Sequence, residues 1–231
     1  MTEQLAFSLS SREESQFSDF LPTRSTRLAV GELQKFARHQ SEQFIYLCGE
    51  TGSGKSHLLH ATCHALMQQG ELPVYLSMAQ PYLSPEAFTD LEQQSVVCLD
   101  DFDHVVGNEQ WEETLFHFYN RCQEQKTQLL IAAHKPAAKL PFVLADLKSR
   151  MCHGLTLVIK PLKDAEKIYV LQQKAYQMGM DLPVEIGAYL LRHVSMDMTI
   201  LMDCLDKLDQ VSLVEQRKLT IPFIRSALNL G

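Results

Sequence analysis

The sequence predicts an α/β domain, built on a parallel sheet of five strands with helices on both faces, that is followed by a small all-helical domain. Five short runs rich in apolar and β-branched residues carry the first part of this prediction. They cover residues 44–48, 73–77, 95–99, 128–133 and 155–159. Strands that are apolar throughout, and that alternate with helices, are typical of a parallel sheet buried on both faces.

Helical patterns separate most of these runs and then take over the rest of the chain. The pattern that begins at Lys55 is followed by Gly70, a residue type that commonly ends helices. Residues 110–125 place large apolar side chains at helical spacing. Beyond Pro161 the strand signals stop. Four amphipathic helices are then predicted, at residues 163–179, 183–194, 198–210 and 221–230.

The clearest shift in composition lies at Lys160–Pro161. We therefore expect an N-terminal tail at residues 1–16, an α/β domain at 17–160 and a helical domain at 161–231. With 45% hydrophobic residues the chain can bury a sizeable core, while a net charge of −7 disfavours a domain that grips nucleic-acid phosphates by itself. Its apolar runs are too short to cross a bilayer, so we expect a cytoplasmic protein that contacts no membrane.

The strongest motif follows the first predicted strand. Residues 49–56 read GETGSGKS, which is the complete G-x-x-x-x-G-K-[ST] phosphate-binding loop between a strand and a helix. The loop consists of Gly49, Glu50, Thr51, Gly52, Ser53, Gly54, Lys55 and Ser56. Its glycines let successive backbone N–H groups point at a phosphate, and the following helix adds the positive end of its dipole. Lys55 is expected to neutralise the outer phosphates, and Ser56 to hold Mg²⁺.

A second candidate piece of the same site ends the strand at residues 95–99 with two carboxylates. Asp100 is the better candidate to reach the water shell of Mg²⁺, in the manner of a Walker-B aspartate. Asp101 occupies the position of an acid that polarises the attacking water, although an aspartate is shorter than the usual glutamate. The alternative is that both acids only shape the turn at the end of the strand.

Three histidines lie on one stripe of the helix after the loop. His57, His60 and His64 follow the spacing i, i+3, i+7. Such a stripe could bind a metal. No cysteine or carboxylate accompanies it at ligand spacing, so we favour a polar stripe beside the nucleotide.

Together the phosphate loop, the strand VVCLDD, the segment LADLKSRM and the helical tail resemble AAA+ ATPases of the DnaA branch. Within that branch the chain is most similar to the Hda-like regulators of replication initiation, through HFYNR at 117–121 and RKLTIPF at 217–223. The resemblance runs from about Phe20 to the C-terminus. DnaA continues into a helix-turn-helix domain that binds origin DNA, and we expect this chain, which ends at Gly231, to lack one.

The resemblance implies a role for several residues. Phe20 and Leu21 match the stretch that wraps the base, although Thr23 and Thr26 replace the usual glycine and asparagine there. His134 lies at the sensor-1 position, where a polar or acidic residue is usual.

Two further positions concern the γ-phosphate. Arg150 in DLKSRM matches the arginine finger, which neutralises charge on a transferred phosphoryl group; the alternative is a surface ion pair. Thr199 takes the place of the sensor-2 arginine, which implies weak hydrolysis in cis and makes a resident diphosphate more plausible.

The N-terminal segment QLAFSL places apolar side chains at alternate positions. On pattern alone it is an ordered tail or a frayed end. The resemblance instead implies a peptide that docks on the DNA polymerase sliding clamp, with Gln4 forming a hydrogen bond and Leu5, Phe7 and Leu9 in apolar contact. The polar residues that follow then serve as a flexible tether.

These implications combine into a nucleotide-gated adaptor with weak ATPase activity at most. It would hold a nucleoside diphosphate, with ADP the first choice over ATP, together with Mg²⁺. It would bind the sliding clamp, contact DNA only through the clamp, and present Arg150 to ATP on the initiator DnaA. A homo-oligomer is also possible within this hypothesis. The competing hypotheses are an autonomous AAA+ ATPase, similar to a helicase or clamp loader, and an origin-binding protein.

Overall fold

The computed structural model describes residues 15–20, 22–23, 26–215 and 219–228, with the side chains of 212–215 excepted. The chain divides into two compact units, Met1–Lys160 and Pro161–Gly231. Each unit has its own hydrophobic core and is described by itself.

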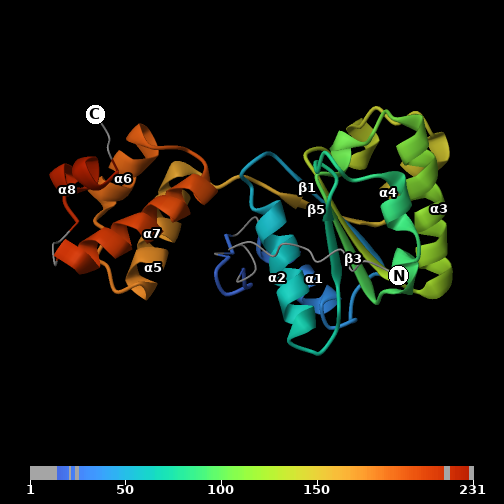
Figure 1. The fold of residues 1–231 in the computed structure, drawn as a ribbon, viewed down its shortest axis with the longest axis horizontal. Helices are drawn as coiled ribbons and strands as arrows, with labels where there is room; N and C mark the ends of the chain where they lie inside the picture. Colours follow the sequence, from blue (N-terminus) through green and yellow to red (C-terminus); the bar gives the residue numbers. More distant parts are fainter. Residues whose placement is uncertain (1–14, 21, 24–25, 216–218, 229–231) are drawn as a thin grey trace. The chain divides into compact units, whose positions relative to one another are not determined.

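The first unit is built on a five-stranded parallel sheet, which confirms the predicted fold class (Figure 1). Its strands are β1 (Phe44–Gly49), β2 (Val74–Ser77), β3 (Val96–Asp100), β4 (Gln128–Ala133) and β5 (Leu155–Ile159). They lie in the order β2-β3-β4-β1-β5, so that β3, β4 and β1 are neighbours at the centre. Because all five strands are parallel, their carboxyl ends meet at one edge of the sheet.

Helices cover both faces of this sheet (Figure 1). On one face α1 (Arg27–Phe36) and α2 (Lys55–Met67) pack on side chains such as Ile45 and Leu47. On the other face the neighbouring strand residues Tyr46 and Cys48 belong to a second core. That core includes buried residues of α3 (Glu109–Gln125) and α4 (Ala145–His153). The alternation of β1 side chains between two apolar cores explains why the strand reads as an uninterrupted apolar run.

Sequence periodicity did not predict α1 or α4. Both are short, and α1 carries Gly31 in its interior, a residue type that weakens helices. The described residues of the unit also form four short 3₁₀ helices: η1 (Pro85–Phe88), η2 (Leu91–Gln93), η3 (Phe102–His104) and η4 (Ala137–Lys139).

The second unit consists of the predicted helices. They are α5 (Asp164–Gln177), α6 (Val184–His193), α7 (Met198–Glu215) and α8 (Ile221–Ala227). Leu171, Leu190, Leu205 and Ile224 are fully buried in its core. No helix among the described residues is long and apolar enough to cross a membrane.

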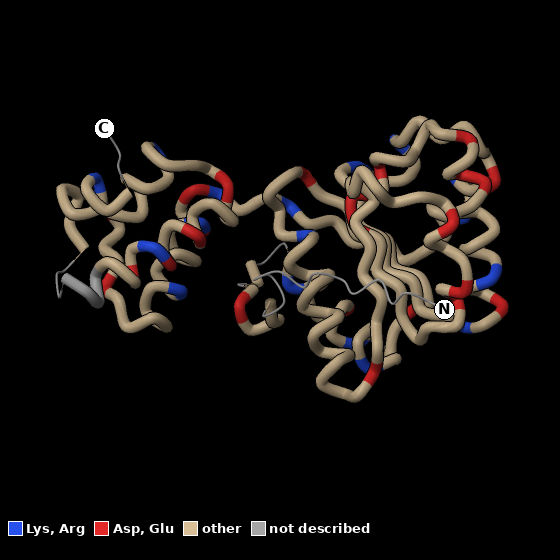
Figure 2. Tube along the Cα trace, viewed as in Figure 1, with Lys and Arg blue, Asp and Glu red and all other residues tan. Residues whose placement is uncertain are grey.

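The five strands carry one charged residue, Asp100, at the end of β3. Figure 2 shows the acidic and basic positions mostly on helices and loops, with the strands nearly devoid of them. Asp100 is only 1% exposed. A carboxylate at such a buried position must be compensated by nearby donors or cations, which directs attention to the carboxyl edge of the sheet.

Candidate nucleotide-binding site

The phosphate loop connects the end of β1 to the start of α2. Gly54 has a left-handed backbone, with φ of +94°, and Gly52 likewise has φ of 73°. A Cβ atom on Gly49 would lie 2.3 Å from the carbonyl oxygen of Ile159 and 2.7 Å from Oγ of Ser53. The glycines at these positions are therefore required by the backbone itself, and they let the loop turn tightly above the first turn of α2.

Lys55 is the cationic residue of the loop. It is 5% exposed, and its Nζ atom donates to the carbonyl oxygens of Gly49 at 2.8 Å and Glu50 at 3.1 Å. Burial lowers the pKa of Lys55, and the carboxylates of Asp100 and Asp101 oppose that effect without cancelling it. The ammonium group is thus held in the loop, within electrostatic range of the acids at the end of β3.

The donors of this loop fit a phosphate group. The hydroxyl of Ser53 is buried and has no hydrogen-bond partner among the described residues. Ser56 follows Lys55 in the first turn of α2, and that turn contains no acidic residue to oppose an anion. A buried hydroxyl, an ammonium group and a helix N-terminus at one loop are the groups that bind phosphate in proteins.

Asp100 is held by two donors. The hydroxyl of Tyr75 donates to its Oδ2 atom at 2.9 Å, and the backbone N–H of Asp101 donates to its Oδ1 atom at 2.9 Å. Burial, together with the negative charge of Asp100, raises the pKa of Tyr75, so its phenol remains a donor. The ring of Tyr75 also stacks on His60, with centroids 4.2 Å apart. These contacts fix the direction of the Asp100 carboxylate.

Asp101 is engaged in a contact between strands. Its backbone is left-handed, with φ of 54°, and its Oδ2 atom accepts a hydrogen bond from the hydroxyl of Ser77 at 2.9 Å. In this arrangement the carboxylate ties the end of β3 to the end of β2.

His134 follows β4 and is fixed by an acid that the sequence analysis did not single out. Its backbone N–H donates to Oδ1 of Asp103 at 2.8 Å, and its Nδ1 atom lies 2.8 Å from Oδ2 of the same residue. Burial alone would raise the pKa of Asp103, but the hydrogen bonds from His134 hold it below the ordinary value. Since the ionised carboxylate only accepts, Nδ1 of His134 carries a proton. The acidic run DDFD at the end of β3 was the available sequence signal for Asp103.

Phe20 lies against the phosphate loop. A Cβ atom added to Gly54 would come within 2.7 Å of its ring, and its centroid is 5.8 Å from that of His57. The predicted base contact at Leu21 lies outside the described residues. Among the described residues no three His, Cys, Asp or Glu side chains, the histidines of α2 included, are grouped closely enough to hold a metal ion directly.

Arg150 lies in the last turn of α4 and is exposed. Its Cζ atom is 5.9 Å from the centre of the Tyr119 ring. Thr199 lies in the first turn of α7, in the helical unit, where it is also exposed and its backbone N–H donates to Asp197 at 2.7 Å.

Gln4, Leu5, Phe7 and Leu9, which the sequence analysis predicts to bind the sliding clamp, lie outside the described part of the chain. Their role in clamp binding therefore stays a prediction.

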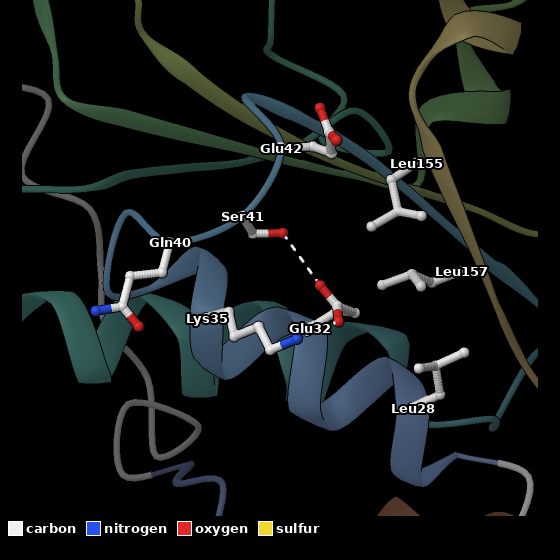
Figure 3. A pocket seen from close by; sticks show the side chains of 8 residues that line it. All are labelled: Leu28, Glu32, Lys35, Gln40, Ser41, Glu42, Leu155 and Leu157. Atoms are coloured by element: carbon white, nitrogen blue, oxygen red, sulfur yellow. Dashed lines mark hydrogen bonds and ion pairs between the residues drawn. The ribbon is translucent and has the colours of Figure 1, made fainter.

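A hollow elsewhere on the first unit has a different character (Figure 3). It lies between α1 and β5, and Leu28, Leu155 and Leu157 provide its apolar lining. Its rim carries an ion pair between Lys35 and Glu32, 2.8 Å apart. Because two glutamates, Glu32 and Glu42, line it against a single lysine, the hollow does not favour a phosphate group.

Comparisons with known proteins agree with this geometry. A sequence model of the bacterial DnaA ATPase domain matches residues 12–158, and a model of the Hda lid domain matches residues 164–228. Domain III of the replication initiation protein DnaA from Thermotoga maritima has a TM-score of 0.75 at 18% identity, covering 93% of this chain and 95% of that one.

Two further solved structures share the fold. DnaA from Aquifex aeolicus bound to AMPPCP has a TM-score of 0.69 at 20% identity, over 87% of this chain and 66% of that chain. The RuvB Holliday junction branch migration motor of Thermotoga maritima has a TM-score of 0.68 at 15% identity, over 94% of this chain and 72% of that chain. The family models carry the assignment, because structural likeness at such identities shows the fold alone. The chain belongs to the bacterial DnaA family of AAA+ ATPases and carries an Hda-type lid domain.

Proposed function

We propose that this chain is a nucleotide-bound adaptor that docks on the DNA-loaded sliding clamp and stimulates ATP hydrolysis by the initiator DnaA. The observation that carries the proposal is a contrast between two sets of groups. The groups that would act on the chain's own γ-phosphate, Asp101 and His134, are engaged with Ser77 and Asp103. Arg150, in contrast, is exposed at the end of a helix, where a partner can reach it.

The phosphate loop serves in this proposal to hold a resident nucleotide. The AMPPCP-bound DnaA of Aquifex aeolicus supports an adenine nucleotide. Lys55 and the buried hydroxyl of Ser53 would contact the phosphates, and Ser56 and Asp100 would hold Mg²⁺, Asp100 through water. Thr199 supplies no cation for a γ-phosphate, which favours ADP. The bound nucleotide would supply negative charge that keeps the loop and the start of α2 in place.

The chemistry then takes place in the pocket of the partner. The planar guanidinium of Arg150 would neutralise charge that develops on the phosphoryl group of ATP bound to DnaA. An arginine finger delivered in this way accelerates hydrolysis by roughly 10³–10⁵-fold. Hydrolysis would switch the initiator off and prevent re-initiation.

The test replaces the finger and leaves the docking surface alone. Arg150→Ala should abolish stimulation of DnaA hydrolysis while clamp binding and nucleotide content are unchanged. Lys139→Ala, which removes an exposed cation from the neighbouring η4, is the matched control and should keep stimulation. Retained stimulation by Arg150→Ala would remove this residue from the mechanism.

The tail is tested separately. Replacing Gln4 and Leu5 by Ala should abolish co-elution with the sliding clamp, since it removes a hydrogen-bonding and an apolar group from the docking peptide. Ser8→Ala, at a position without a predicted contact, should co-elute normally. A Gln4, Leu5 variant that still co-elutes would show that the clamp binds elsewhere.

A further inference from the structure

We infer that α3 is the platform that positions Arg150, with Tyr119 as the positioning residue beneath its guanidinium and Glu112 as the residue that fixes the start of its helix. This inference rests on the proposed function of Arg150 and deepens it. It assigns a task to two residues of α3 that the nucleotide site does not use.

The first contact is at the beginning of α4. Glu112 is fully buried, and its carboxylate accepts backbone N–H groups of Val143 at 2.9 Å and Leu144 at 2.6 Å. It also accepts the N–H of Gly107 at 2.7 Å. Leu144 is the N-cap residue that directly precedes α4, and its own apolar side chain cannot cap the helix. Glu112 therefore satisfies the backbone N–H of the N-cap residue from another helix, and its charge interacts favourably with the helix dipole.

The second contact is at the end of α4. The guanidinium carbon of Arg150 lies 5.9 Å from the centre of the Tyr119 ring, within the range of a cation–π interaction. The ring is 7% exposed, and Phe44 packs edge-on against it with centroids 5.5 Å apart. Because the ring is held on its buried side, it offers a fixed surface to an otherwise exposed arginine.

The two contacts match in spacing. Glu112 and Tyr119 are seven residues apart, so they lie on one face of α3, about 10 Å apart along the helix axis. Leu144 and Arg150 are six residues apart, about 9 Å along α4. The helices lie close together in Figure 1. Paired contacts at both ends fix the position and the direction of α4, and hence the point from which Arg150 extends.

Tyr119 lies in the segment HFYNR, whose other members give a matched control. Phe118 is also a buried ring below an arginine, with Arg121 Cζ 6.0 Å from its centre. Arg121, however, forms an ion pair with Glu92 at 3.1 Å and holds the η2 region of the same unit. Phe118 and Tyr119 are thus neighbouring rings with the same kind of contact, and only Tyr119 contacts the proposed finger.

The test measures the stimulated hydrolysis rate of DnaA as a function of the concentration of this protein, with the clamp on DNA. Tyr119→Leu should lower the plateau rate by about twofold to fivefold, the size expected for loss of an exposed cation–π contact, while the half-maximal concentration is unchanged. Tyr119→Phe keeps the ring and should restore the wild-type plateau. Phe118→Leu should keep the plateau although it also truncates the core.

The outcomes separate the positioning role of Tyr119 from the proposed function of Arg150. A wild-type plateau for Tyr119→Leu, with stimulation abolished in Arg150→Ala, would overturn the positioning role and leave the proposed function intact. Equal losses in Phe118→Leu and Tyr119→Leu would also overturn it, since they indicate general destabilisation. Retained stimulation in Arg150→Ala would overturn the proposed function itself. If Tyr119→Leu does not fold, Tyr119→Met takes its place under the same criteria.

Discussion

The buried carboxylate of Glu112 gives the most quantitative prediction about the first unit. In Glu112→Gln one carboxylate oxygen becomes an NH₂ group, which cannot accept a hydrogen bond. In the native protein both oxygens accept: Oε1 from Gly107 at 2.7 Å, and Oε2 from Val143 at 2.9 Å and Leu144 at 2.6 Å. The substitution therefore removes at least one N–H···O contact. It also places the new side-chain NH₂ donor opposite a backbone N–H donor.

The magnitude follows from the type of contact that is lost. A hydrogen bond to a charged group contributes about 1.5–3 kcal/mol, so the loss of one such bond lowers the free energy of unfolding by about 1.5–3 kcal/mol. For a protein of this size that corresponds to a decrease in Tm of about 3–12 °C.

The assay is thermal unfolding followed by tryptophan fluorescence. Trp111 is the single tryptophan of the chain, and it lies in α3 next to Glu112, so the signal reports the first unit. Glu113→Gln changes the exposed neighbour on the same helix and should unfold within about 2 °C of the wild type. A Glu112→Gln protein with the same Tm as this control would refute the capping role of Glu112.

Three further predictions concern the loop and the opposite edge of the sheet. Lys55→Ala should weaken ADP binding by about 10- to 100-fold in calorimetry, because a charged hydrogen-bond donor is lost. Gly54→Ala should lower both Tm and ADP affinity, since a left-handed backbone at φ +94° costs an L-residue about 1–2 kcal/mol. Burial would raise the pKa of Glu71, but hydrogen bonds from Ser95 and His39 hold it below 4.5. The carboxylate therefore stabilises the fold above pH 4.5 and loses this contribution as the pH falls through the lower folded value. Glu71→Gln should accordingly lower Tm at neutral pH, with a difference from the wild type that shrinks in acid.

The strands and the phosphate loop could be predicted because their physical cause is local. A strand buried on both faces must be apolar along its length, so β1 and β4 are visible as short runs. The loop needs glycines where the backbone is left-handed and a lysine at the start of a helix. Residues 49–56 contain these residues in that order. The same holds for Asp100, a carboxylate at the end of an apolar strand.

The supporting contacts could not be predicted because they depend on partners that are distant in sequence. Glu112 reads as one acid among several in EQWEET, and only its burial beside the start of α4 distinguishes it. Tyr119 and Asp103 likewise gain their roles from Arg150 and His134, about 30 residues away. The helix α4 was missed for a related reason: its cap comes from another helix and leaves no signal in its own sequence.

The proposed function requires that the ATP consumed is the one bound to DnaA. DnaA loaded with ATP labelled in the γ-phosphate would be mixed with this protein in its ADP form and the clamp on DNA, and phosphate release would be followed. We predict release from DnaA accelerated by at least about tenfold, with negligible release when this protein is loaded with labelled ATP alone. Rapid turnover by the isolated protein, with no acceleration on DnaA, would contradict the account.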